Sequence, residues 1–249
     1  MDHLVSVIES PQATLDERIA AAHELAALGD PRISGAGAGR IAIPGTSSAI
    51  DRYPVTVQAF SAFIAANGYL ERRWWSDEGW SWREKDEIVG PRFWGEAEWA
   101  PYLVANHPVV GISYHEAEAY AAFIGARLPG ENEWQKAACG EAPRKYPWGD
   151  EWRDDACGMR GFGPRSTVPV GIFPKGRSPI GVSDMVGSVW QWCTDPFVGW
   201  GDKDEEASSP RRTTRGGAWN TLAWSLTCQS RNGFPKTARF SNLGFRCVA

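Results

Sequence analysis

With 249 residues, 43% of them hydrophobic, and a formal net charge of −4, the chain can bury the core of one large domain or two small ones. The weakly acidic balance and the lack of a lysine/arginine block do not fit an electrostatic nucleic-acid binder. No apolar run approaches the roughly 20 residues that span a bilayer, and the N-terminus has no signal-peptide pattern. We therefore expect a cytoplasmic protein with no nucleic-acid and no membrane partner.

The N-terminal segment, residues 1–33, has a helical pattern. A helix is predicted from Thr14 to Leu28, because apolar residues recur there at near-helical spacing. Residues 34–39 (SGAGAG) form a flexible glycine-rich linker. The linker separates this segment from a main domain over residues 40–249. The alanine-rich helix is a candidate docking element for a partner.

Three more helices are predicted in the main domain. One runs from about Thr56 to Ala66, with Thr56 as its N-cap. Ser113 and Glu116 form a capping box that begins the next helix. Glu131–Cys139 forms a short helix after a Pro-Gly pair.

Past Cys139 the sequence has no long helical pattern. It has many glycines and prolines, with short strand-like runs such as Val168–Phe173 and Val189–Trp192. This combination is typical of an α+β domain with short twisted strands and much ordered loop.

Glu71–Trp99 is rich in tryptophan, with charges between the aromatic residues. Its helical periodicity fails, and it is too aromatic for disorder. We predict a long ordered loop whose tryptophans pack it onto the domain. The alternative is an aromatic wall that faces a ligand.

The five cysteines are odd in number and never have C-x-x-C spacing. They are Cys139, Cys157, Cys193, Cys228 and Cys247. This pattern predicts isolated buried or half-buried thiols rather than a disulfide framework or a metal knuckle.

The stretch from Arg215 to Arg246 has a rigid opening (RGGAW) and a rigid close (NLGFR). Between them, aromatic and small polar residues follow no periodicity. Fixed ends around a chemically mixed centre predict a surface displayed on a scaffold.

A series of motifs follows in a fixed order: Arg52–Thr56 (RYPVT), His107–Ser113 (HPVVGIS), Arg127–Pro129 (RLP), Tyr146–Asp150 (YPWGD), Asp184–Gly187 (DMVG), Arg215–Trp219 (RGGAW) and Asn242–Arg246 (NLGFR). As a set they resemble the formylglycine-generating enzyme family, also called the sulfatase-modifying-factor family. The resemblance covers about residues 40–249 and implies a C-type-lectin-like fold.

One branch of that family consists of copper-dependent oxidases, which use two cysteines shortly after the RGG motif. Paired thiolates suit Cu(I) because soft sulfur ligands select it. In this chain Cys228 is the only thiol of that region, and its distance from Arg231 matches a non-catalytic family position. The pair is therefore missing.

A second branch consists of iron-dependent sulfoxide synthases, which take three histidines from an attached helical domain. The histidines here, His3, His23, His107 and His115, form no H-x-x-x-H pair. We interpret His107 as a hydrogen-bonded loop residue and His115 as an exposed residue on the first turn of a helix. A facial metal site is therefore not expected.

The family's calcium motif is also altered, because Ser188 and Gln191 stand where an asparagine and a glutamate are usual. Loss of the carboxylate removes charge that a hard cation needs. We predict no metal site, no cofactor and no catalytic residue; calcium bound through backbone carbonyls is the alternative that stays open.

A third branch, which fits best, contains non-enzymatic ligand binders, including the variable proteins of diversity-generating retroelements. The length between the opening and closing motifs matches that branch. We therefore predict a non-catalytic protein that binds a protein or other macromolecular ligand through a variable-type surface over residues 219–242. The predicted binding residues are Asn220, Thr221, Leu222, Trp224, Ser225, Thr227, Gln229, Ser230, Asn232, Phe234, Ala238, Phe240 and Ser241.

Within this surface the aromatic residues are the expected anchors, and the small polar residues would set hydrogen-bond specificity. Arg215, Arg231 and Arg246 are expected to be scaffold arginines that bind carboxylates or carbonyls. Three alternatives stay open: a metal-dependent oxidoreductase of the family type, a regulatory pseudoenzyme, or an enzyme that uses Asp184 or Glu133 without a metal.

Overall fold

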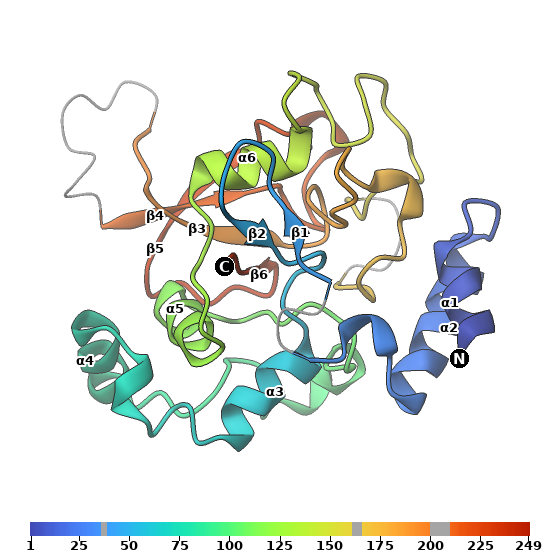
Figure 1. Ribbon diagram of the computed structural model, residues 1–249. Coiled ribbons are helices and arrows are strands. Elements are labelled where there is room, and N and C mark those ends of the chain that lie inside the picture. Colours follow the sequence, from blue (N-terminus) through green and yellow to red (C-terminus); the bar gives the residue numbers. More distant parts are fainter. Residues whose placement is uncertain (36–38, 161–165, 200–209) are drawn as a thin grey trace.

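The helices and strands are short and are joined by long loops (Figure 1). The computed structural model describes residues 1–35, 39–160, 166–199 and 210–249. The α-helices are α1 (Asp2–Glu9), α2 (Leu15–Leu28), α3 (Val57–Ala65), α4 (Asp77–Lys85), α5 (Tyr114–Phe123) and α6 (Glu131–Cys139). The strands are β1 (Ile41–Ala42), β2 (Ala49–Ile50), β3 (Trp190–Pro196), β4 (Arg211–Arg215), β5 (Arg231–Pro235) and β6 (Leu243–Gly244). This is the α+β class that the sequence predicts.

A four-stranded sheet with the order β5-β4-β3-β6 lies at the centre of the main domain. β3 pairs antiparallel with β4, with Gln191 opposite Arg215, and β4 pairs antiparallel with β5. β6 joins β3 in parallel, with Leu243 opposite Trp190. The sheet therefore fixes the start, the middle and the end of the Arg215–Arg246 stretch.

The last residues of the chain lie beside residues 49–55. Asp51 donates its backbone N–H to the Cys247 carbonyl at 2.9 Å, and Val55 donates to the Phe245 carbonyl at 2.9 Å. Ala49 and Ala249 exchange backbone hydrogen bonds in both directions. Segments almost 200 residues apart thus lie side by side, and β2 of the β1–β2 hairpin belongs to the first of them.

The predicted helix starts are confirmed. Thr14 caps α2 in a capping box with Glu17. Ser113 Oγ accepts the Glu116 N–H at 3.1 Å, and the Glu116 carboxylate accepts the Ser113 N–H at 2.8 Å. These reciprocal bonds satisfy N–H groups that have no partner inside the helix.

The prediction for Glu71–Trp99 is wrong in one respect, because this stretch contains the helix α4. Ser76 caps α4 by accepting the Gly79 N–H at 3.3 Å. The apolar pattern failed because the two tryptophans of α4, Trp80 and Trp82, lie two positions apart and form no stripe at helical spacing. The packing role of the tryptophans is confirmed: Trp74, Trp80, Trp82 and Trp94 contact the aromatic core around α3 and α5.

The N-terminal helices α1 and α2 pack on the main domain. Ile8 and Leu25 are fully buried in a cluster with Ile172 and Phe173. Val168–Phe173 is therefore a buried loop, and the strand predicted there is wrong, because its apolar residues contact the two helices rather than a sheet. Of the predicted linker, residues 36–38 lie outside the described residues.

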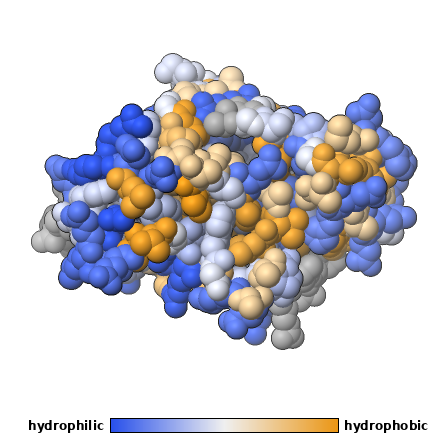
Figure 2. Space-filling model, turned by 90° about the horizontal axis from the view of Figure 1, so that it is seen from below, coloured by the Kyte–Doolittle hydropathy of each residue, from blue (hydrophilic) through white to orange (hydrophobic). Residues whose placement is uncertain are grey.

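Figure 2 shows the molecule from below the view of Figure 1, where hydrophobic residues form several patches separated by hydrophilic ones. Scattered patches of this kind are normal on a protein surface. In the described parts of the chain, no helix combines the length and the hydrophobicity needed to cross a bilayer.

Candidate ligand-binding site

Two glycines set where the displayed segment begins. Gly216 and Gly217 have φ angles of 94° and 75°, in the region that favours glycine. A Cβ on Gly216 would lie 2.3 Å from the Met185 carbonyl oxygen. Beyond them, Trp219 donates its backbone N–H to Ser188 at 2.9 Å. The backbone at Gly216 therefore lies so close to the backbone at Met185 that only glycine fits at this position of the RGG motif.

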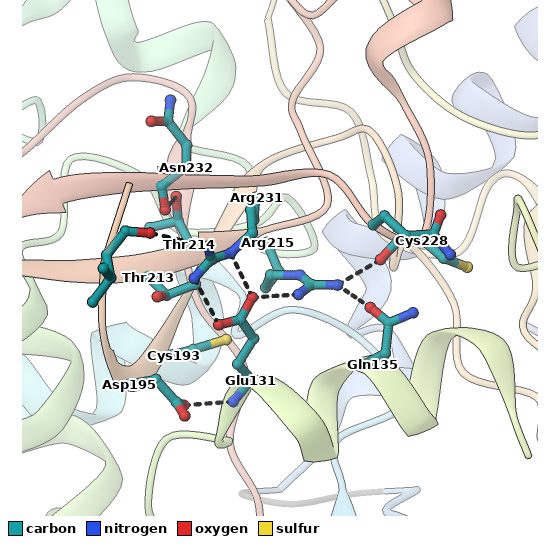
Figure 3. A network of polar contacts seen from close by, with 12 residues as sticks. Glu131, Gln135, Cys193, Asp195, Thr213, Thr214, Arg215, Cys228, Arg231 and Asn232 are labelled. Carbon is teal, nitrogen blue, oxygen red and sulfur yellow. Dashed lines mark hydrogen bonds and ion pairs between the residues drawn. The ribbon is translucent and has the colours of Figure 1, made fainter. Parts of the chain in front are cut away.

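A shared carboxylate holds two arginines, one before the segment and one within it (Figure 3). Glu131, at the start of α6, binds Arg215 at 2.5 Å and Arg231 at 2.8 Å. The Glu131 N–H in turn donates to Asp195 Oδ2 at 2.6 Å, and Arg215 donates to the Cys228 carbonyl at 2.6 Å. The predicted scaffold role of these arginines is confirmed.

Arg246 is fully buried and binds oxygen atoms on all sides. It donates to Gln191 Oε1 at 2.7 Å and to the carbonyls of Asp51 and Ser183 at 2.8 Å. Burial lowers the pKa of its guanidinium to about 10. Arg246 therefore joins the closing motif to three distant loops, as a scaffold residue.

None of the predicted binding residues is buried. Five are exposed, and three of these have large apolar side chains: Asn220, Leu222, Trp224, Gln229 and Phe240. The others are half-buried: Thr221, Ser225, Thr227, Ser230, Asn232, Phe234, Ala238 and Ser241. Within the half-buried group, the Phe234 ring contacts Trp190, Trp192 and Phe240, so it joins the surface to the core.

Several polar side chains of the segment stabilise the loop itself. Thr221 Oγ1 accepts the Ala218 N–H at 3.0 Å, and Ser230 Oγ accepts the Thr227 N–H at 2.8 Å. The Gln229 side chain donates to the Arg144 carbonyl at 3.3 Å. These bonds hold the backbone while the neighbouring apolar side chains stay exposed.

A pocket of about 390 Å³ opens at the end of the segment. Four predicted residues line it: Asn220, Phe234, Phe240 and Ser241. Arg239 and Asn242, which lie within the predicted surface but were not among the predicted binding residues, also line it, and Arg92 and Phe93 complete the lining from outside that surface. Arg92 and Phe93 come from the tryptophan-rich stretch Glu71–Trp99. The alternative interpretation of that stretch, an aromatic wall that faces a ligand, would have indicated these two residues.

The two arginines of the pocket have different surroundings. The Arg239 guanidinium binds the buried Glu116 carboxylate at 3.0 Å. Burial raises the pKa of Glu116, while Arg239 and the Tyr69 hydroxyl, which donates at 2.6 Å, act to lower it. Arg92 forms no ion pair among the described residues, and one of its N–H groups donates to the Arg239 carbonyl at 3.2 Å. The pocket therefore combines aromatic surface with one uncompensated positive charge.

The donor atoms do not fit the metal sites that the family resemblance implies. In the described part of the chain, no three His, Cys, Asp or Glu side chains converge as a metal site would require. His107 binds Thr167 Oγ1 at 3.0 Å and faces His23 at 3.2 Å, so its predicted hydrogen-bonded role is confirmed. The prediction that His115 is exposed is wrong: it is 3% exposed, because Trp82 of α4 covers its ring.

All five cysteines are free and buried, as predicted. At the positions after the RGG motif where the copper enzymes place two thiols, Cys228 stands alone. A two-thiolate copper site is therefore not built by this segment.

Comparisons with known proteins place these features in a family. The family of Sulfatase-modifying factor enzyme 1-like domains matches residues 21–249. A hercynine oxygenase from Mycolicibacterium thermoresistibile is 37% identical over 74% of this chain and 46% of the relative. A formylglycine-generating enzyme from Thermomonospora curvata is 32% identical over 80% of this chain and 81% of the relative. The chain thus spans about half the length of the hercynine oxygenases it matches.

Solved structures share the fold. PvdO from Pseudomonas aeruginosa matches with a TM-score of 0.59 and 23% identity, covering 81% of this chain and 79% of that one. Treponema denticola variable protein 1 matches with a TM-score of 0.58 and 20% identity, covering 81% of this chain and 84% of that one. The fold is C-type-lectin-like, as predicted.

The relatives named from sequence are enzymes, so their names do not support the prediction of a non-catalytic protein. The likeness to the variable protein concerns the fold alone. The family match, the confirmed motif roles and the shared fold agree, and the chain belongs to the family of Sulfatase-modifying factor enzyme 1-like (formylglycine-generating-enzyme) domains.

Proposed function

We propose that this chain is a ligand-recognition member of its family, which binds a protein or other macromolecular ligand through residues 219–242. One observation carries the proposal: Trp224, Leu222 and Phe240 are 78%, 42% and 43% exposed on one hydrogen-bonded segment. Exposure of large apolar side chains to water is unfavourable, and a partner that covers them lowers the free energy. Aromatic residues of this kind dominate binding at many interfaces.

The pocket beside Phe240 supports the same function. Its phenylalanine rings offer apolar contact, and Arg92 offers a charge that no carboxylate of the described residues neutralises. An acidic side chain or another anionic group of the ligand fits this combination, because a guanidinium binds carboxylates and phosphates strongly.

The named relatives favour a second candidate function. The chain would then be the family domain of a metal-dependent oxidoreductase, with its metal ligands supplied from outside the described residues. The 37% identity to a hercynine oxygenase supports this candidate, since more than half of that relative has no counterpart here. A regulatory pseudoenzyme would keep the same surface without turnover.

Binding of anilinonaphthalene sulfonate tests the recognition site, because this fluorescent probe combines aromatic rings with an anionic group. We expect saturable binding that Phe240→Ala and Arg92→Gln each weaken about tenfold, which corresponds to about 1.4 kcal/mol. Leu70→Ala is the matched control, since Leu70 is 66% exposed outside the segment. Equal binding by all variants would contradict the proposal.

The second candidate has its own readout. Conversion of hercynine in the presence of Fe²⁺, a thiol and oxygen, or of a cysteine peptide in the presence of Cu⁺, would establish an oxidoreductase. Loss of probe binding in Phe240→Ala, without turnover by the native chain, would instead support recognition alone.

A further inference from the structure

The N-terminal helical hairpin carries a groove of its own. It has a volume of about 610 Å³ and lies between α1 and α2. On α2 it is lined by Glu17, Ala20, Ala21 and Glu24, which lie three or four positions apart and therefore share one face of the helix. From Glu17 to Glu24 this face extends over about two turns, or roughly 10 Å. The groove is therefore long enough to take a segment of another helix.

The inside of the groove is apolar. Leu4 and Val7 of α1 line it together with the small side chains of Ala20 and Ala21. Leu4, Val7 and Ala21 also belong to the hydrophobic cluster through which Leu25 holds the hairpin on the main domain. Figure 2 shows hydrophobic residues gathered at the end of the molecule where α1 and α2 lie in Figure 1, on the right of both views. The groove therefore extends the core to the surface, and its alanines let a partner helix approach α2 closely.

The rim of the groove is acidic. Glu17 and Glu24 are exposed, and Asp2 and Asp16 add exposed carboxylates on the same two helices. Among the described residues, none of these four carboxylates forms an ion pair. The only lysine or arginine of residues 1–28 is Arg18, whose side chain is buried at 3% exposure. The hairpin therefore presents an apolar groove in a field of negative charge.

This combination decides between the possible occupants. The acidic rim repels a nucleic acid or an anionic membrane, and a second copy of the hairpin would bring two acidic rims together. A cationic partner is attracted instead. A cleft between two helices fits a third helix that buries one apolar face in it, with anchors at helical spacing. Lysine or arginine residues seven positions apart on such a helix would reach Glu17 and Glu24, which are themselves seven positions apart.

We propose that the groove between α1 and α2 is the docking site for a basic amphipathic helix of another protein. The apolar face of that helix covers Leu4, Val7 and Ala20, and its basic residues bind Glu17 and Glu24 at the rim. The groove shares no residue with the surface over residues 219–242. Docking there leaves the proposed recognition surface free, so the chain can link its ligand to a second protein.

Selection from a displayed library of randomised helices of about 20 residues, with the full-length chain as bait, tests the proposal. We expect the enriched sequences to combine apolar residues at helical spacing with lysine or arginine on the flanks. A synthetic peptide of the enriched sequence should bind about tenfold more weakly when NaCl is raised from about 0.05 M to about 0.5 M. Enrichment of acidic or uncharged helices, or no enrichment at all, would overturn the proposal.

Variants place the bound peptide on the molecule. Glu24→Lys should weaken peptide binding about tenfold or more, and Ala20→Arg should abolish it, because it fills the groove and reverses its charge. Glu84→Lys and Ala62→Arg are the matched controls, since these residues are exposed on α4 and α3 outside the groove. Both controls should bind like the native chain. Equal losses in the controls would mean that the peptide responds only to overall charge, which contradicts docking in the groove.

The rejected occupants have their own readouts. Sedimentation velocity of the native chain would reveal a dimer, and flotation with phosphatidylserine vesicles would reveal membrane binding. We expect neither. A dimer that Ala20→Arg dissociates, or vesicle binding that Glu24→Lys strengthens and Ala62→Arg does not, would assign the groove to that occupant and overturn the proposal. Unchanged melting temperatures of the groove variants show that their folds are intact, because both substituted residues are exposed.

Discussion

Replacing Arg246 with methionine should destabilise the fold more than any surface change. Arg246 is fully buried and donates to five oxygen atoms: Gln191 Oε1 at 2.7 Å, the Asp51 and Ser183 carbonyls at 2.8 Å, the Asp184 carbonyl at 3.1 Å and the Arg52 carbonyl at 3.3 Å. Methionine fills similar space but offers no donor. The acceptors would then stay buried without partners.

The magnitude follows from the number of lost bonds. At about 1 kcal/mol net for each hydrogen bond, five bonds correspond to about 5 kcal/mol, and relaxation or entry of water reduces this. We expect the free energy of unfolding to fall by about 3–5 kcal/mol. For a chain of this length, that corresponds to a melting temperature roughly 10–15 °C lower.

Urea unfolding followed by tryptophan fluorescence measures the effect, with Arg231→Met as the matched control. The Arg231 side chain is 34% exposed and binds Glu131 at 2.8 Å, so its loss should cost about 1 kcal/mol or less. If the free energy of unfolding fell by less than about 1 kcal/mol for Arg246→Met, or by equal amounts for both variants, the scaffold role assigned to Arg246 would be refuted.

Two further outcomes concern pH and packing. Burial, with a smaller contribution from the charge of His23, lowers the pKa of His107 to about 3, whereas an unfolded histidine titrates near 6.5. The unfolded chain therefore binds the extra proton first, and the free energy of unfolding should fall between pH 6.5 and 3, by about 2 kcal/mol at pH 5. His107→Gln should remove this part of the pH dependence in urea titrations at pH 5 and 7.5, and an unchanged difference would contradict it. Gly176→Ala should cost at least about 2–3 kcal/mol in the same assay, because its Cβ would lie 1.7 Å from the Ala156 carbonyl oxygen. Gly90→Ala, which meets no atom within 4 Å, should be nearly neutral, and similar losses for both glycines would exclude the steric explanation.

Local signals in the sequence predicted local structure well. The Ser113–Glu116 box and the Thr14 cap lie where the sequence places them, because a cap depends on residues three positions apart. The helix α4 was missed because Trp80 and Trp82 lie two positions apart and form no stripe at helical spacing, although Ser76 at the start of the helix is an ordinary N-cap. A cap followed by acidic residues was the available signal.

Contacts between distant segments limited the prediction of the site. The displayed segment was found from its fixed ends, but the pocket also needs Arg92, which bonds to Arg239 from 147 positions away. His115 was assigned to the surface for the same reason, since only the folded position of Trp82 buries it.

The pairing of residues 49–55 with residues 245–249 has a consequence for biosynthesis. These backbone hydrogen bonds cannot form until nearly the whole domain has been synthesised. Until then, the backbone N–H and C=O groups of residues 49–55 that form them lack these partners. Contacts of such long range make folding slow and favour association between unfinished chains. Deleting residues 245–249 should therefore prevent the domain from folding, and chaperone demand should be high until these residues have been synthesised.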